Sequence, residues 1–427
     1  MNMYEQSTLD NGLQIVTNRL SGRESVGLAI WVRVGGRYEQ KKLSGISHFV
    51  EHMLFKGTKK RTTKEIKENI EGVGGMLNAF TSEESTCYFV KIPKNRFEHA
   101  YDVLQDMVND ATLSVDEFKK ERTVILEEIK MYLDLPSQHV HEIMSELLWA
   151  NQPLGRPIAG TVETVSEMSR NDLYEHVQSY YHSKNILVTA SGDIDHDYFK
   201  GITERYFARR ADKQLSKFQV VKNSPNGKAA RFQLINKKTE QTHFVIGFHG
   251  LPRNHVDRYK LGLLNVILGG NMSSRLFEQV REQRGLAYEI KSGLSFFHDS
   301  GSVSISAGVE PKKAPLAIKV IMKELSKLKR SFVSKNELRR AKDYFLGQFL
   351  LGLEDTLDNA LWYGERILYG GELPNIQEIQ SGMEKVTEDD IQNLANQFFK
   401  SSDIHLALIG PTDSTYESKI TSECQCP

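Results

Sequence analysis

The sequence predicts an α+β fold of two similar domains, each an antiparallel sheet with helices packed on one face. Two observations predict it. Strand patterns are grouped together and are followed by grouped helix patterns, and this whole plan occurs twice along the chain. A chain of 427 residues has room for two to four domains at roughly 100–200 residues each, so two domains of about 200 residues are the simplest division.

The repeat is clearest in two helix starts and two strand ends. The strings Ser-Val-Asp-Glu at 114–117 and Ser-Lys-Asn-Glu at 334–337 have the spacing of a capping box and begin 220 residues apart. Residues 179–192 and 397–410 each resemble a helix end, a polar turn and a strand closed by glycine, and their final glycines lie 218 residues apart. The second half therefore repeats the plan of the first.

The elements within the two halves agree with this repeat. Each half has a strand that precedes a helix, then two strands joined by a polar turn, then a helix. We predict single strands at 26–34 and 244–248, strand pairs at 77–92 and 286–309, and helices at 96–109 and 312–327. The polar segment with Ser224 and Pro225 separates the halves, so the predicted division is a domain at 1–212, a linker at 213–229 and a domain at 230–427.

The composition excludes several classes of protein. Lys and Arg number 55 and so do Asp and Glu, which gives no overall charge for attracting nucleic acid or an anionic membrane. No run approaches the roughly 18 apolar residues of a spanning helix, and the start does not resemble a signal or transit peptide, so we expect a cytoplasmic protein. Three cysteines exclude a disulfide framework. We expect Cys87 to be a core residue and the Cys424-x-Cys426 pair to be a frayed tail.

The string His48-x-x-Glu51-His52 suggests a metal site. It lies in a helix predicted at 44–56, with Gly57 as its stop. Residues four apart share a helical face, so both histidines can direct a ring nitrogen at one ion. Two imidazoles and a carboxylate, with one position open for water, commonly hold catalytic zinc, and Glu51 is then a candidate general base. The alternative is a helix with two ordinary histidines and a solvated glutamate.

A third ligand is available on the helix that begins near Ser114. Glu121, Ile125 and Glu128 fall at i, i+4 and i+7, which is one stripe of that helix. Two acids two turns apart suit one direct ligand and one supporting carboxylate. Glutamate-rich helix faces are more often simply solvated, so the spacing alone leaves both interpretations open.

Together these residues resemble the inverzincin zinc peptidases of the pitrilysin and insulin-degrading-enzyme family. Glu128 follows His52 by 76 residues, and the likeness extends over essentially the whole chain. The most similar subgroup contains single-length bacterial processing proteases and the mitochondrial processing peptidase β subunit. The resemblance implies that His48, His52 and Glu128 bind one zinc ion per chain, that Glu51 activates water and that Glu121 supports the site.

The resemblance also implies substrate contacts. Asn78, Ala79, Phe80 and Thr81 match the family's substrate-binding edge strand, and Arg281 with Tyr288 match a pair that contacts the substrate carbonyl. In this subgroup two chains form a clamshell, and each supplies the Arg/Tyr pair to the zinc of the other, which implies a homodimer with composite active sites. Relatives that prefer an upstream arginine carry two acids after the last zinc ligand. Here those positions are Gln138 and Glu142, so only one acid is present.

The second half has no histidine pair, and Gln348 stands at the position that corresponds to Glu128, so we expect a metal-free domain. The overall prediction is a zinc endopeptidase for extended or unfolded peptides, with presequence-like peptides among the candidates. One alternative is a non-catalytic structural or partner subunit of a heteromeric peptidase of this fold. A second alternative is an enzyme that is active only with a different, metal-free partner chain. A third is a module that binds peptides at the edge strand without cleaving them. His/His/Glu sets also accept cobalt or manganese.

Overall fold

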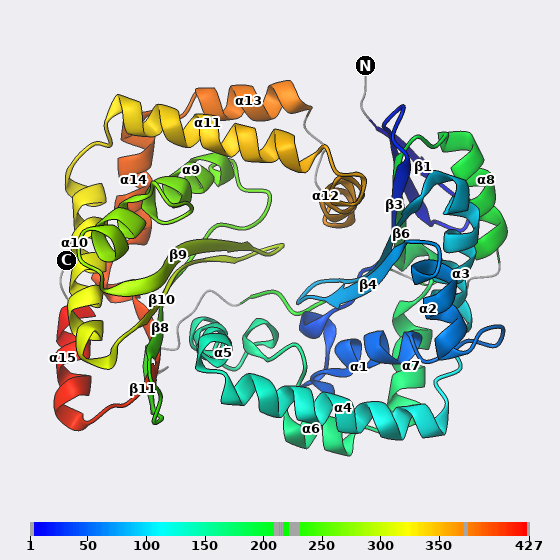
Figure 1. Ribbon diagram of the computed structural model, residues 1–427, viewed down its shortest axis with the longest axis horizontal. Helices are drawn as coiled ribbons and strands as arrows, with labels where there is room; N and C mark the ends of the chain where they lie inside the picture. Colours follow the sequence, from blue (N-terminus) through cyan, green and yellow to red (C-terminus); the bar gives the residue numbers. More distant parts are fainter. Residues whose placement is uncertain are drawn as a thin grey trace. The chain divides into compact units, whose positions relative to one another are not determined.

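The computed structural model describes residues 4–208, 213, 215, 217–221, 231–370 and 375–424. The chain forms two compact units, which we call the first and the second unit. The first unit comprises Met1–Lys130, Arg156–Gln219 and Leu350–Asn375, and the second comprises Met131–Gly155, Val220–Phe349 and Ile376–Pro427. Figure 1 labels their elements.

The first unit contains a six-stranded sheet in the order β1-β2-β6-β3-β5-β4. All neighbouring strands are antiparallel except β2 and β6, which are parallel. β4 lies at one edge, with β5 as its neighbour. The strands are β1 (Glu5–Thr8), β2 (Gln14–Arg19), β3 (Ser25–Val32), β4 (Met76–Thr81), β5 (Thr86–Pro93) and β6 (Ile186–Gly192).

Most helices of the first unit cover one face of this sheet and enclose its main core. They are α1 (Ile46–Leu54), α2 (Thr63–Glu71), α3 (Phe97–Asp110), α4 (Val115–Asp134), α6 (Val162–Glu167), α7 (Arg170–Tyr180) and α8 (His196–Phe207). The last turn of α4 passes into the second unit.

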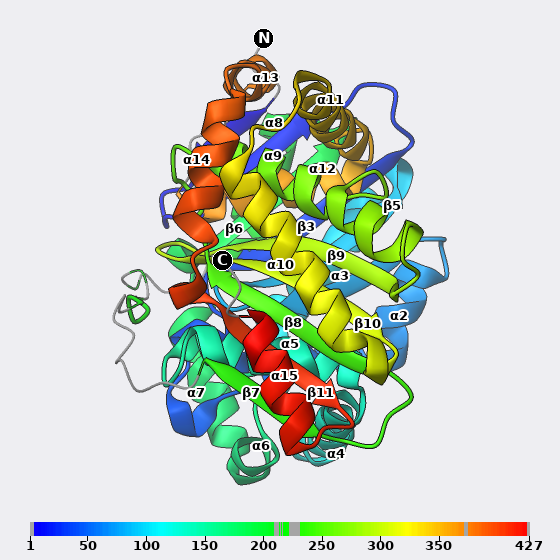
Figure 2. The ribbon, with the colours of Figure 1, turned by 90° about the vertical axis from the view of Figure 1, so that its left-hand side faces the viewer.

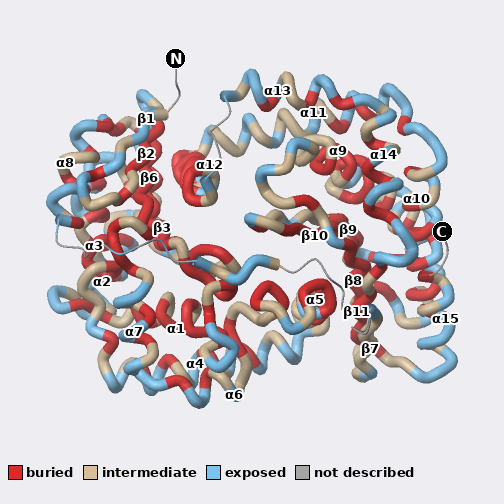
Figure 3. The backbone as a smooth tube through the Cα atoms, turned by 180° about the vertical axis from the view of Figure 1, so that it is seen from behind, coloured by how far each residue is buried: buried red, intermediate tan, exposed pale blue. Residues whose placement is uncertain are grey.

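Helix α12 (Thr356–Leu368) covers the opposite face of the same sheet. Strands β3 and β6 are therefore buried on both faces, as their nearly continuous apolar sequences require (Figure 3). A buried polar network fixes the helix, because Asn359 Oδ1 accepts hydrogen bonds from Asn18 Nδ2 at 2.8 Å and from Ser191 Oγ at 2.6 Å. This helix is missing from the sequence prediction, which placed helices on one face alone.

The second unit contains a five-stranded sheet in the order β7-β11-β8-β10-β9. Its strands are β7 (Phe232–Asn236), β8 (Thr242–His249), β9 (Ala287–Phe296), β10 (Gly301–Val309) and β11 (His405–Gly410). Its helices are α5 (Pro136–Leu148), α9 (Arg258–Leu268), α10 (Ala314–Arg330), α11 (Lys335–Gly352), α13 (Ile376–Glu384), α14 (Glu388–Phe398) and α15 (Ser414–Cys424). Helix α10 lies on the outside and packs against α14 and α15 (Figure 2).

The two sheets have the same topology. The order β2-β6-β3-β5-β4 corresponds strand by strand to β7-β11-β8-β10-β9, and β7 is parallel to β11 just as β2 is parallel to β6. The predicted α+β class and the internal repeat are thus confirmed, with one parallel pair in each otherwise antiparallel sheet.

On the sheet face opposite the main core of each unit, the covering helix comes from the other half of the sequence. Helix α5 follows α4 in the chain but packs on β8 and β11 through Val140, Met144 and neighbouring apolar residues. Helix α12 follows α11 but packs on the sheet of the first unit. The compact units therefore interleave along the sequence. The predicted linker at 213–229 falls largely outside the described residues, so the domain boundaries stay a prediction.

The cysteines differ partly from expectation. Cys87 is fully buried and unpaired, as expected of a core residue. Cys424 is also buried, at the end of α15, because that helix packs into the core of the second unit. The expectation of a frayed tail is therefore wrong for Cys424, and Cys426 lies outside the described residues. In the part of the chain that is described, no helix has the length and apolar character needed to cross a membrane.

Candidate metal centre

Helix α1 holds the two motif histidines in a fixed orientation. Its apolar residues Ile46, Phe49, Val50 and Met53 are buried in the core of the first unit, which leaves the stripe of His48 and His52 facing outward. The two rings lie with their centroids 4.6 Å apart. The core contacts therefore decide where both imidazoles point.

The start of α1 is capped by a carboxylate from outside the helix. Gly45, the N-cap residue, has a φ of 96° and no side chain that could accept hydrogen bonds from the free backbone N–H groups of the first turn. Glu39 replaces that cap: its two carboxylate oxygens accept hydrogen bonds from the backbone N–H groups of Gly45 at 2.7 Å and Ser47 at 2.8 Å. An acid at a helix N-terminus also interacts favourably with the helix dipole.

His176 of α7 lies beneath the same helix. Its Nε2 is 3.3 Å from Ser47 Oγ, and its ring packs on Tyr180 at 4.7 Å. Burial lowers the pKa of His176 to about 3.

This burial predicts an acid sensitivity. Below pH 6.5 the unfolded chain protonates His176 while the folded chain does not, so the free energy of unfolding should fall as the pH drops towards 3. The contribution is at most about 1.4 kcal/mol per pH unit. Denaturant titrations of the wild type and His176→Gln between pH 7 and pH 4 check it, and parallel pH slopes for the two proteins would contradict it.

Helix α4 supplies the acidic residues. Its buried side chains include Phe118, Ile125 and Ile129, and these residues fix the face that Glu121 and Glu128 share. Glu127, one position away, is exposed and pairs with Lys130. Glu121 lies 3.2 Å and Glu128 lies 3.6 Å from ring nitrogens of His52, so the stripe predicted from the sequence is directed at α1.

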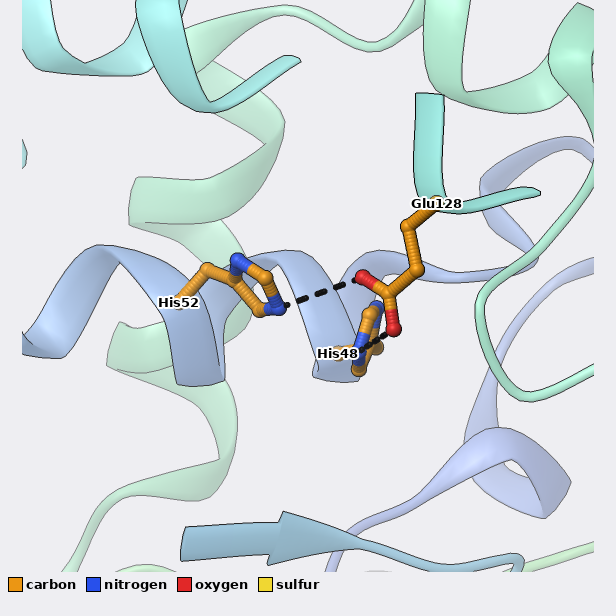
Figure 4. A group of neighbouring side chains, drawn as sticks. All are labelled: His48, His52 and Glu128. Carbon is orange, nitrogen blue, oxygen red and sulfur yellow. Dashed lines mark ion pairs between the residues drawn. The ribbon is translucent and has the colours of Figure 1, made fainter. Parts of the chain in front are cut away.

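His48, His52 and Glu128 form the one group of metal-ligating side chains found among the described residues. Their ligand atoms lie within 4.8 Å of one another. His48 Nε2 is 3.9 Å from Glu128 Oε1, and His52 Nε2 is 3.6 Å from Glu128 Oε2 (Figure 4). Two imidazoles and one carboxylate converging on one point match a tetrahedral zinc site with a fourth position open.

The electrostatics of His48 fit a metal ligand. Burial, together with the nearby His52, lowers the pKa of His48 to about 3, so its ring is neutral at pH 7, the form that binds a metal. Its Nδ1 is buried and has no hydrogen-bond partner among the described residues. These residues thus fit a zinc ion.

Glu51 lies one position before His52 on the same helix. Burial raises the pKa of its carboxyl, against the lowering effect of a hydrogen bond from Thr81 Oγ1 to Glu51 Oε2 at 2.5 Å. Thr81 is the last residue of the edge strand β4. A half-buried carboxylate with a raised pKa suits a general base.

Glu121 contacts a ligand without joining the ligand group. Its Oε2 is 3.2 Å from His52 Nδ1, and its Oε1 is 2.7 Å from Lys56 Nζ. Burial opposes ionisation of Glu121, but the hydrogen bonds from His52 and Lys56 outweigh it and lower the pKa of the carboxyl. A carboxylate with these contacts has the arrangement that is common next to a metal-binding histidine.

The predicted substrate strand is β4. Its main chain pairs with β5, and its side chains alternate between half-buried and exposed. Phe80 packs edge-on against Trp31 at 5.6 Å, and Thr81 reaches Glu51.

Three further predicted residues belong to the second unit. The Arg281 guanidinium lies 5.0 Å from the centre of the Tyr288 ring, and Tyr288 is 79% exposed. Glu142 lies on α5, where burial raises the pKa of its carboxyl. The second unit also contains Gln348, on α11.

The fold and this site define a class. A His-x-x-Glu-His helix, a distant glutamate ligand and a repeated α+β plan are those of a two-domain zinc metallopeptidase.

Comparison with known proteins agrees. Residues 14–162 match the family model described as Insulinase (Peptidase family M16), and residues 167–345 match the Peptidase M16 inactive domain. The chain is 36% identical to the "Uncharacterized zinc protease YmxG" of Bacillus subtilis, over 96% of this chain and 99% of that protein. It is 34% identical to the "Uncharacterized zinc protease SCO5738" of Streptomyces coelicolor, over 97% of this chain and 91% of that protein.

A crystal structure of a protease from Helicobacter pylori shares the fold with a TM-score of 0.90, at 24% identity, covering 96% of this chain and 99% of that one. The chain belongs to peptidase family M16 and is a zinc metallopeptidase. The resemblance to the pitrilysin and insulin-degrading-enzyme family is confirmed.

Sequence reasoning missed two residues around the site. Glu39 caps α1 from a preceding loop, and no local pattern marks it. Lys56 pairs with Glu121, and its spacing four residues after His52 could have indicated it.

Proposed function

We propose that this protein is an endopeptidase that cleaves extended or unfolded polypeptides. One observation carries the proposal: Glu51 lies beside the His/His/Glu group and is hydrogen-bonded to the end of an edge strand. A proton acceptor is thus linked directly to a backbone edge at which a peptide could bind.

Different residues of the chain would bind the metal, transfer the proton and hold the proton acceptor in place. A zinc ion held by His48, His52 and Glu128 supplies Lewis-acid chemistry and lowers the pKa of water. The Glu51 carboxylate takes the proton from the attacking water and returns it to the leaving amine. The hydroxyl of Thr81 holds that carboxylate in place.

The edge strand β4 would bind substrate by strand addition. An extended peptide uses its main chain for the hydrogen bonds, so many sequences are accepted while compact domains are not. Asn78, Ala79, Phe80 and Thr81 are the residues of β4 to which we assign this contact.

Arg281 and Tyr288 would stabilise the developing oxyanion. A guanidinium and a phenol hydroxyl directed at that charge lower the barrier. The proximity of the two side chains and the exposure of Tyr288 support this role. We assign the pair to the active site of a second copy, which makes the enzyme a homodimer with composite sites.

Mixing two inactive variants tests the composite site. In an equal mixture of Glu51→Gln and Tyr288→Phe, half of the dimers are mixed and each mixed dimer has one intact site, so about a quarter of wild-type activity should return. Peptide cleavage is the measurement, with exchange verified by native mass spectrometry. Complete exchange of subunits without recovered cleavage activity would contradict the composite-site proposal.

Glu142 would bind a basic side chain of the substrate. Its carboxylate has no hydrogen bond or ion pair within the described part of the chain, and a half-buried carboxylate of this kind suits an incoming guanidinium.

Glu142→Gln should therefore lower kcat/KM roughly tenfold for a peptide with arginine upstream of the cut, and leave the matched alanine peptide unchanged. Glu146→Gln, an exposed acid one turn along α5, is the control. Equal losses on both peptides would exclude arginine recognition.

The experiment for the proposed function is cleavage of a quenched, unstructured peptide with and without 1,10-phenanthroline. We expect internal cleavage that stops with the chelator and returns with added zinc. No cleavage by zinc-loaded protein would favour a non-catalytic subunit or a requirement for another chain. Binding without turnover would favour a peptide-binding module.

A further inference from the structure

Lys56 lies at the point where the metal-binding helix ends. Its backbone N–H bonds to the Met53 carbonyl at 3.1 Å, which continues the last turn of α1. Gly57 then has a φ of 110°, a conformation that favours glycine, and the chain turns away. Lys56 thus follows His52 by one helical turn, and its side chain is only 24% exposed.

Glu121 connects Lys56 to His52. One carboxylate oxygen is 2.7 Å from Lys56 Nζ and the other is 3.2 Å from His52 Nδ1, so both oxygens have partners. The Glu121 side chain is 6% exposed. A carboxylate removed from water to this extent needs charged or hydrogen-bonding partners to stay in one orientation.

The orientation of Glu121 decides which nitrogen of His52 is available. When Nδ1–H donates to Glu121, the lone pair of Nε2 is free, and Nε2 is the atom that lies 3.6 Å from Glu128. We propose that Lys56 is a positioning residue of the zinc site, which fixes the Glu121 carboxylate so that His52 presents Nε2 to the metal.

A simple electrostatic effect predicts the opposite sign. A positive side chain near a divalent cation repels it, so removing that charge alone should strengthen zinc binding. If Lys56 acts by positioning Glu121, removing it should weaken zinc binding instead. The direction of the change therefore separates the two explanations.

The test compares Lys56→Met with Lys56→Arg and with Lys59→Met. Lys59 lies three residues further on, is 75% exposed and pairs with Asp110. The substitution Lys59→Met therefore removes the same positive charge at a position that does not contact Glu121. Zinc affinity is measured on the metal-free proteins by competition with a fluorescent chelator. We expect Lys56→Met to weaken zinc binding by about 10- to 100-fold, Lys56→Arg to retain most of the affinity and Lys59→Met to match the wild type.

A second measurement distinguishes a positioning role of Lys56 from a general loss of folding in the variant. In a Glu121→Gln background, Lys56→Met should change zinc affinity less than about twofold, because the group it positions is already altered. Selective ¹⁵N-histidine spectra of the metal-free protein should show the Nδ1–H form of His52 in the wild type and a mixture in Lys56→Met. Unchanged or tighter zinc binding in Lys56→Met, or an equal effect in both backgrounds, would overturn the proposal.

Discussion

Glu51→Gln should reduce peptide cleavage by about 10³-fold and leave zinc in place. The amide keeps the size of the side chain and can still accept the Thr81 hydrogen bond, but it cannot accept the proton of water. Glu51 is not in the ligand group, so the affinity for zinc should change little. Burial disfavours its charge, so the melting temperature should be unchanged or slightly higher.

Three measurements belong together here: the cleavage rate of an unstructured peptide, zinc content by mass spectrometry and thermal unfolding. Glu51→Asp is a useful companion, because it keeps the carboxylate and withdraws it by one methylene. Wild-type cleavage by zinc-loaded Glu51→Gln would show that another group is the base. A variant that has lost its zinc would instead show that Glu51 belongs to the ligands.

Glu128→Gln should release the metal. Glu128 is the carboxylate that reaches both histidine rings, and an amide oxygen is a much weaker ligand than a carboxylate oxygen. Because loss of a supporting partner alone weakens a metal site by about 10- to 100-fold, loss of a direct ligand should weaken zinc binding by at least about 100-fold, with a parallel loss of cleavage.

The matched control is Glu127→Gln. Glu127 is the neighbouring residue on the same helix, but it is exposed and pairs with Lys130. It carries the same charge change without facing the site, so its zinc content and activity should equal those of the wild type. Comparable zinc loss in both variants would point to a charge effect of the whole helix, and full zinc retention in Glu128→Gln would remove Glu128 from the ligands.

Local sequence patterns were sufficient for much of the fold and of the metal site. The repeat predicted two equivalent sheets, and the strand orders bear this out. Helical spacing placed His48 and His52 on one stripe, and Glu121 and Glu128 on another, since burial of the intervening apolar residues fixes each helix. That the two stripes belong to one site was implied by the family resemblance, because the spacing alone leaves a metal site and ordinary helix faces both open.

Contacts between distant segments could not be predicted in this way. The amphipathic patterns of α5 and α12 show that each helix buries one face, but they carry no information on which sheet it covers. The hydrogen bond from Thr81 to Glu51 likewise depends on how β4 lies against α1. Such pairings are set by tertiary packing, which spacing along the chain does not encode.

The exchange of α5 and α12 has a consequence for fragments of this protein. A cut between the halves would not release two independent domains, since each fragment would keep a helix that covers the other's sheet. The N-terminal fragment would expose Val16, Trp31 and Leu187, and the C-terminal fragment would expose Val245 and Ile409. We therefore expect each half to fold poorly when it is expressed alone. When the two halves are produced together, fragment complementation should cover both apolar faces again.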